Sequence, residues 1–81
     1  MKLSIIDIEK ITQYAVAWIE LNTPVGNIVI QAEHAPMIIQ LSPNHELIFE
    51  LLSGEQKSIM MIQAIAHITR DEVKIITPGI I

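Results

Sequence analysis

Short apolar runs separated by turn-forming residues limit, more than any other feature, what this chain can fold into. The clearest run is ELIFELL, residues 46–52, in which Leu47, Phe49 and Leu51 alternate with Glu46 and Glu50. Such period-two alternation is typical of a β-strand with one buried face. Similar runs occupy residues 3–8, 14–21, 28–30, 37–41, 58–69 and 73–77, with turn formers such as SPNHE and SGEQK between them. Strands that recur about every 8–12 residues predict an all-β fold, a small flattened sandwich or barrel.

The run SIMMIQAIAHIT, residues 58–69, is long enough to be a helix, but it also fits a long strand. We favour the strand, because β-branched residues recur in it and turns flank it at short spacing. Only one of Met60 and Met61 can then face inward. Strict alternation turns the following side chains toward the core: Ile62, Ala64, Ala66 and Ile68.

Length and composition predict one small domain that covers residues 1–81. A chain of 81 residues buries only somewhat more than ~60% of its unfolded surface, so it has little stability to spare. Hydrophobic residues make up 51% of the chain and aromatic residues only 4%. We therefore expect a core of branched aliphatic side chains, which suit a pleated sheet better than a helix.

The charge pattern excludes several classes of partner. The formal charge is −4 and the five basic residues are scattered, so no basic stripe is available for nucleic acid or anionic lipid. The chain has no cysteine, which excludes disulfides and thiolate chemistry. Asp7 and Glu9 interrupt the first apolar run, whereas a signal peptide has an uninterrupted apolar segment. No apolar run approaches the ~20 residues that span a bilayer. These features predict a soluble, cytoplasmic domain without direct membrane insertion.

The titratable residues form no pattern typical of an active site or a metal site. His34, His45 and His67 lie far apart, without HxH, HxxxH or HExxH spacing, so we expect no bound metal. Glu46 and Glu50 share a strand face, but strand rise separates them by roughly 13 Å, too far for a catalytic pair. No serine has a nucleophile-elbow context, and the three glycines form no phosphate loop. We expect a protein that is not an enzyme, with no catalytic residue, no cofactor and no small-molecule substrate.

The tripeptide His34-Ala35-Pro36 stands between two apolar runs. Proline cannot donate to a strand ladder, and it pushes the preceding residue toward extended angles. This backbone chemistry favours a structural role, at a bend beside a strand edge, over a functional one.

Residues 26–43, GNIVIQAEHAPMIIQLSP, resemble the N-terminal domain of the epsilon subunit of F-type ATP synthase, which carries a stretch of the form GELGILPGHAPLIAPLKPG. Gly26 aligns with the first glycine of that stretch, and His34-Ala35-Pro36 align with its HAP. Residues 14–21 are similar to the preceding strand of the family. Residues 58–77 resemble its later VLAVSGGFVEVTPDKVTVLA, with direct matches at Asp71 and Val73.

The resemblance implies a sandwich of about eight to ten short strands. It also implies a non-catalytic central-stalk (rotor) subunit, peripheral to the inner face of the plasma membrane, that couples the gamma subunit to the membrane ring. The loop at residues 22–27 would face the ring, and His34 would lie on or near the surface that meets gamma. The partner-contact residues expected on this basis are Gly26, Asn27, Ile28, Glu33, His34, Met60 and Ile62.

The chain departs from the family pattern at several positions. Asn27 stands where the family usually has a glutamate, which weakens a charge-based ring contact. Glycines of the pattern are replaced by Val29, by Glu33 and by Gln63-Ala64, which changes the backbone angles that are readily available. The family continues into a helical hairpin, so the sequence is either cut before it or a short, divergent relative, and no regulatory role is implied. A second hypothesis stays open: a free-standing β-sandwich interaction module with no role in ATP synthase.

Overall fold

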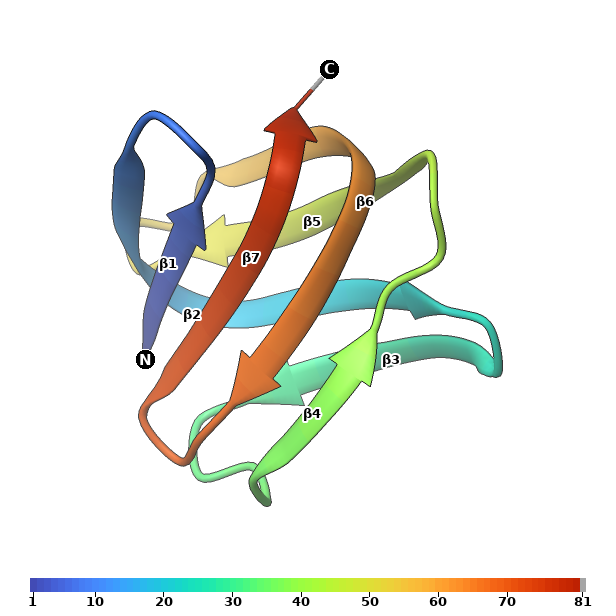
Figure 1. Ribbon diagram of the computed structural model, residues 1–81. Coiled ribbons are helices and arrows are strands. Elements are labelled where there is room, and N and C mark those ends of the chain that lie inside the picture. The colour runs from blue at the N-terminus through green and yellow to red at the C-terminus, as the bar shows by residue number, and fades with distance from the viewer. Residues whose placement is uncertain (81) are drawn as a thin grey trace.

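The computed structural model describes residues 1–80 and contains strands but no helix in that range (Figure 1). This confirms the all-β prediction, including the strand assignment of the ambiguous run. The strands are β1 (Lys2–Ile6), β2 (Ile11–Thr23), β3 (Gly26–Gln31), β4 (Met37–Gln40), β5 (His45–Leu51), β6 (Gln56–Ile68) and β7 (Glu72–Ile80).

The strands form two packed layers, a sandwich that is closed along one side. In Figure 1 the nearer layer contains β1, β7, β4 and much of β6, and the farther layer contains β5, β2 and β3. β1 pairs with β7 in parallel and with β2 in antiparallel orientation, so it joins the two layers. β3 pairs only with β2, and β4 only with β6, so each has one free edge within the described residues.

The structure has seven strands rather than the expected eight to ten. The reason is that β2 and β6 are each 13 residues long and serve both layers. In β6, the first half pairs with β5, and the second half pairs with β7 and β4. One long, bent strand therefore takes the place of two short strands, one in each layer.

The core between the layers is aliphatic, as the composition predicts. Leu47 and Phe49 of β5 are both buried, which confirms the inward face of ELIFELL. Phe49 is the one aromatic ring in the core cluster, and the half-buried Tyr14 packs against it with ring centroids 4.9 Å apart. Burial of each such large apolar side chain contributes about 1.5–3 kcal/mol.

Three register shifts, two in β6 and one in β2, interrupt the alternation of buried and exposed residues in the long strands. In β6 the shifts fall between Met61 and Gln63 and between Gln63 and Ile65. Met61 and Ala64 are therefore both buried, while Ile62 and Gln63 between them face solvent. The prediction that Ile62 faces inward is wrong: its side chain is 48% exposed, because a β-bulge adds a residue to one strand and resets the alternation.

The other inward positions of that run, Ala64, Ala66 and Ile68, are buried as predicted. β2 has a comparable shift between Val16 and Trp18. Val16 and Ile19 are consequently both in the core, although strict alternation places them on opposite faces.

Candidate partner-binding site

The turn between β2 and β3 is a tight hairpin whose tip is fully accessible. Gly26 has φ 130°, a backbone conformation that side chains rarely allow, which explains why a glycine stands here. The hydroxyl of Thr23 donates to the carbonyl oxygen of Gly26 at 2.6 Å and accepts from the N–H of Val25 at 3.3 Å. Val25 is 90% exposed at the tip. The turn thus presents an apolar side chain from a fixed backbone.

Next to the tip, the expected contact residues Asn27 and Ile28 point in different directions. Asn27 is exposed, and its Nδ2 donates to Oδ1 of Asn22 at 3.3 Å across the strand pair. Ile28 is half-buried and packs against the core. The outward surface beside the turn is therefore neutral and amide-rich.

Residues 32–36, here termed the HAP loop, connect the edge strand of one layer to the edge strand of the other. Glu33 has φ 68°, a left-handed conformation that costs a non-glycine residue about 1–2 kcal/mol. Its N–H donates to the carbonyl oxygen of Arg70 at 2.9 Å, and its carboxylate lies 3.8 Å from the Arg70 guanidinium. The β6–β7 turn therefore braces the HAP loop through one backbone bond and one exposed ion pair.

His34 is half-buried in this loop, with Nδ1 2.8 Å from the carbonyl oxygen of Ala35. Pro36 immediately precedes β4, where a missing N–H is harmless at the start of an edge strand. The geometry agrees with a structural role for the tripeptide at a bend.

Sequence reasoning missed both the left-handed backbone at Glu33 and the brace from Arg70. The first had a signal, since the resembling family carries a glycine at this position. The second had none, because Arg70 reaches the loop only through the pairing of β4 with β6.

The outward face of the nearer layer carries an apolar patch, here termed the front patch. Register places Ile6, Ile76, Ile65 and Gln40 in one row across β1, β7, β6 and β4. These residues, with Ile8, Pro78 and others, line an open depression of about 420 Å³. Ile62 lies beside it, 3.8 Å from the position that a Cβ on Gly79 would take.

The expected contact residues are divided among four places. Gly26 and Asn27 lie at one end of β3, and Glu33 and His34 follow its other end, roughly 20 Å away by strand rise. Met60 pairs with Glu46 on the outward face of the farther layer, whereas Ile62, beyond the bulge, lies with the front patch. The structure forms two separate contact regions from these residues, and it separates the two β6 side chains from each other.

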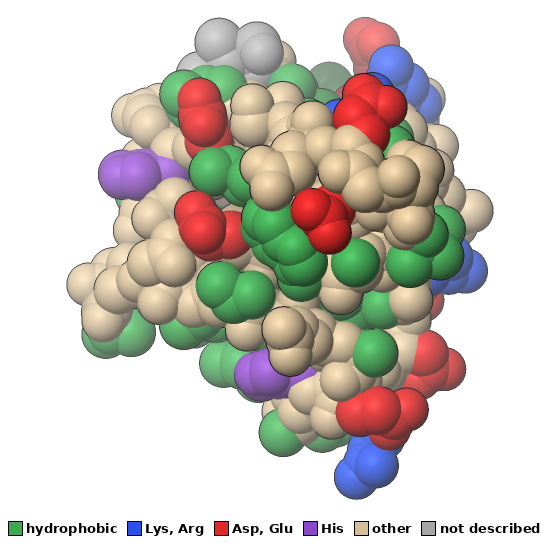
Figure 2. Space-filling model, turned by 180° about the vertical axis from the view of Figure 1, so that it is seen from behind, with side chains coloured by type: hydrophobic (Ala, Val, Ile, Leu, Met, Phe, Trp, Pro, Cys, Tyr) green, Lys and Arg blue, Asp and Glu red, His purple; other side chains and the backbone are tan. Residues whose placement is uncertain are grey.

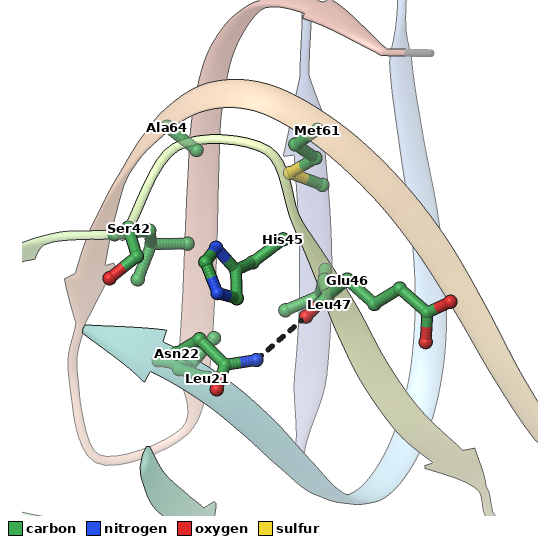
Figure 3. Close-up of a pocket in the computed structure, with 9 residues that line it drawn as sticks. Leu21, Asn22, Ser42, His45, Glu46, Leu47, Met61 and Ala64 are labelled. Carbon is green, nitrogen blue, oxygen red and sulfur yellow. Dashed lines mark hydrogen bonds between the residues drawn. The ribbon is translucent and has the colours of Figure 1, made fainter. Parts of the chain in front are cut away.

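A small pocket beside β5 gathers polar groups without forming a catalytic site (Figure 3). His45 Nδ1 lies 2.8 Å from the carbonyl oxygen of Pro43, and Asn22 Nδ2 donates to the carbonyl oxygen of Glu46 at 3.3 Å. The cavity is about 10 Å³, near the least volume that holds one water molecule. It leaves no room for a substrate.

Within residues 1–80, no three His, Asp or Glu side chains come together as a metal ion would need. The same range has no helix long and apolar enough to cross a bilayer. The pKa of Asp7 is lowered because its carboxylate accepts from the N–H groups of Glu9 and Lys10 at 2.7 and 2.9 Å.

Comparison with known proteins places these features in a family. The family described as "ATP synthase, Delta/Epsilon chain, beta-sandwich domain" matches residues 1–81. A chain of the cryo-EM structure of Euglena gracilis mitochondrial ATP synthase (OSCP/F1/c-ring, rotational state 1) is similar with a TM-score of 0.88 and 24% identity, over 98% of this chain and 51% of that chain. No curated protein sequence matches the chain.

A second similar chain belongs to the cryo-EM structure of the central stalk and c-ring of Tetrahymena thermophila mitochondrial ATP synthase. Its TM-score is 0.83 at 14% identity, over 100% of this chain and 65% of that chain. At these identities the likeness concerns the fold. The present chain spans about half to two-thirds of the length of the two chains that it matches.

Proposed function

Since the chain belongs to the family of β-sandwich domains of ATP synthase delta and epsilon chains, we propose that it serves as a non-catalytic part of the central stalk, coupling the gamma subunit to the membrane ring. The family match over residues 1–81 carries this proposal. The two similar structures support it, because one is of F1 with the c-ring and the other is of the central stalk with the c-ring. The location that goes with this role is peripheral, at the inner face of the membrane.

A coupling subunit has to hold two partners at a fixed separation. The hairpin at Gly26 and the HAP loop at His34 lie at opposite ends of β3, and both are tied to the sandwich by hydrogen bonds. We assign the hairpin, with Asn27 and its neighbour Ile28, to the ring contact. We assign Glu33 and His34 to the gamma contact. Torque can then pass along a short, hydrogen-bonded strand rather than through a flexible linker.

Apolar side chains add the burial that a stable stalk contact needs. Ile62 and the front patch lie on the same layer as the HAP loop's brace, the β6–β7 turn, and we assign them to gamma. Met60, on the other layer, adds a second apolar contact. Exposed apolar patches of this kind on a small domain mark surfaces that are covered by partners.

The test is a pull-down from the membrane extract of the native host with the full chain as bait. Recovery of gamma together with ring subunits supports the proposal, and His34→Ala should reduce the recovery of gamma. The matched control is His67→Ala, since His67 is an exposed histidine on β6 outside the assigned contacts. If His67→Ala lowers recovery as much as His34→Ala does, the assignment of His34 is overturned.

A second candidate function is a free-standing β-sandwich interaction module. Asn27 favours it, because the turn then lacks the carboxylate that the family usually presents to the ring. A folded bait that recovers neither gamma nor ring subunits would support this candidate and limit the family likeness to the fold.

A further inference from the structure

The outward face of the farther layer, here termed the back face, is the other outward sheet face formed by residues 1–80. It consists of the outward side chains of β3, β2, β5 and the first half of β6. Two cross-strand rows define its centre: Val29–Glu20–Ile48–Ser58 and Gln31–Trp18–Glu50–Gln56. Trp18, Glu20, Ile48 and Glu50 are only half-exposed, so the face is a surface of mixed apolar and acidic character.

Three glutamates follow one another across this face without a cationic neighbour. Glu20 on β2 lies diagonally between Glu50 and Glu46 on β5, since it is paired with Ile48. Diagonal neighbours in a sheet are about 7–8 Å apart, within reach of long side chains. Among residues 1–80, the ion pairs within 4.0 Å use other carboxylates, those of Glu33, Glu55 and Glu72.

The space-filling view from behind shows the same imbalance (Figure 2). Acidic side chains are interspersed with apolar ones over this side, while the Lys and Arg side chains lie at the margin of the view. Like charges at this spacing repel one another, and an acidic face without counter-charges attracts a basic partner.

The apolar residues decide what kind of basic partner fits. Trp18 and Ile48 occupy the centre of the face, and Val29, which is 48% exposed, lies at its edge. Free cations would leave these side chains in water, whereas the leucine side of an amphipathic helix would cover them. A helix laid on a sheet face is also the ordinary way to bury such a surface.

We propose that the back face docks an amphipathic helix of a partner chain that carries arginine or lysine at positions i, i+4 and i+8. Successive glutamates are two strand residues apart along the sheet, roughly 6.6 Å, and four residues of helix rise roughly 6.0 Å. Three basic side chains on one helical stripe therefore meet Glu50, Glu20 and Glu46 in turn. The stripe also places a guanidinium over the indole of Trp18. This inference does not depend on the proposed stalk function.

The two other occupants that the surface suggests fit less well. A second copy would set glutamates against glutamates in a chain that already has a formal charge of −4. A metal ion needs converging ligands, and no such group exists among the described residues.

The experiment uses the full chain and a tryptophan-free synthetic helix with arginines at i, i+4 and i+8 and leucines at the adjoining positions. Trp18 is the one tryptophan of the sequence, so its emission reports directly on the back face. We expect a saturable blue shift of the Trp18 emission as the peptide is added. Raising the salt from 50 to 500 mM should weaken the binding of the peptide severalfold. A second peptide with glutamine in place of each arginine should bind at least about tenfold more weakly.

Removing carboxylate charges from the back face of the protein is the test that matches the removal of charge from the peptide. The double variant Glu20→Gln, Glu50→Gln should weaken the binding of the arginine peptide by roughly tenfold, since two partly screened ion pairs are lost. Glu9→Gln, an exposed change in the β1–β2 turn, should leave the affinity unchanged. Far-ultraviolet circular dichroism establishes that all variants are folded.

Three results would overturn the proposal. The first is equal affinity for the arginine and glutamine peptides, which would leave only an apolar contact. The second is equal weakening by Glu9→Gln, which would reduce the effect to net charge. The third is a blue shift that depends on protein concentration without any peptide, which would identify a second copy as the occupant.

Discussion

The two sides of the sandwich differ in how their strands are paired, and they therefore differ in what they contribute to stability and to partner contacts. On the closed side, β1 is paired along both edges, with β2 and with β7. On the open side, β3 and β4 each keep a free edge, and the HAP loop with its Arg70 brace is what joins them. Leu3 and Ile5 of β1 are buried in the core, whereas the open side offers a loop and two free strand edges to partners. We infer that the closed side contributes more to the stability of the fold, and that the open side adds loop and edge contacts to those assigned to the front patch.

The largest expected effect is at the closed side. Leu3 in β1 is fully buried, so Leu3→Ala should lower the free energy of unfolding by about 3–4 kcal/mol through lost burial and a residual cavity. Urea denaturation followed by Trp18 emission measures it. A loss below about 1 kcal/mol would show that β1 is not essential to the core.

The matching change on the open side is Ile39→Ala in β4, where the side chain is half-buried against the core. We expect a loss of about 1–1.5 kcal/mol by the same measurement, because less apolar surface returns to water. If Ile39→Ala costs as much as Leu3→Ala, the two sides are energetically equivalent and the comparison fails.

A smaller effect sharpens the description of the HAP loop. Because Glu33 adopts a left-handed backbone, Glu33→Gly should be more stable than Glu33→Ala by about 1 kcal/mol. At Gln31, an exposed β3 position outside the positive-φ residues, the order should reverse, with Gln31→Ala the more stable. Thermal unfolding of the four variants gives both differences. The same order at both positions would contradict a left-handed Glu33.

The smallest effect concerns the β1–β2 turn on the closed side. The pKa of the Asp7 carboxyl is lowered in the folded state by backbone N–H donors. The ionised carboxylate therefore contributes its full stabilisation at pH values above the ordinary pKa of about 3.9. This contribution is lost as the pH falls through the lower pKa of the folded state. Asp7→Asn keeps an acceptor oxygen but does not titrate. It should flatten the stability profile below about pH 4 in acid denaturation, and an unchanged profile would contradict the role of this turn.

The fold was largely predictable from side-chain alternation, and the error at Ile62 has a physical origin in strand pairing. Leu47 and Phe49 were placed correctly because β5 pairs with β6 without a register shift. Ile62 was misplaced because a bulge is a mismatch between two strands, which the alternation of one strand does not encode. Gln63-Ala64 also stands where the resembling family has two glycines, so the residues at this bulge carry no composition signal.

The candidate site was predictable only in part. The HAP loop and the hairpin at Gly26 could be found from the sequence, because proline and glycine restrict the backbone locally. Their separation along β3, the brace from Arg70 and the rows of the back face depend on strand register. Register arises from long-range pairing and so is not evident in any one segment.

The pairing of β1 with β7 has a consequence for biosynthesis. It joins Lys2 to Glu72, so β1, which is synthesised earlier, has both edges covered only after β7 has been synthesised. Until then Leu3 and Ile5 can be sheltered only by the hairpin with β2. Such long-range closure is intrinsically slow and leaves an open apolar edge in the meantime. This domain is therefore most exposed to aggregation during synthesis in the interval before β7 pairs with β1.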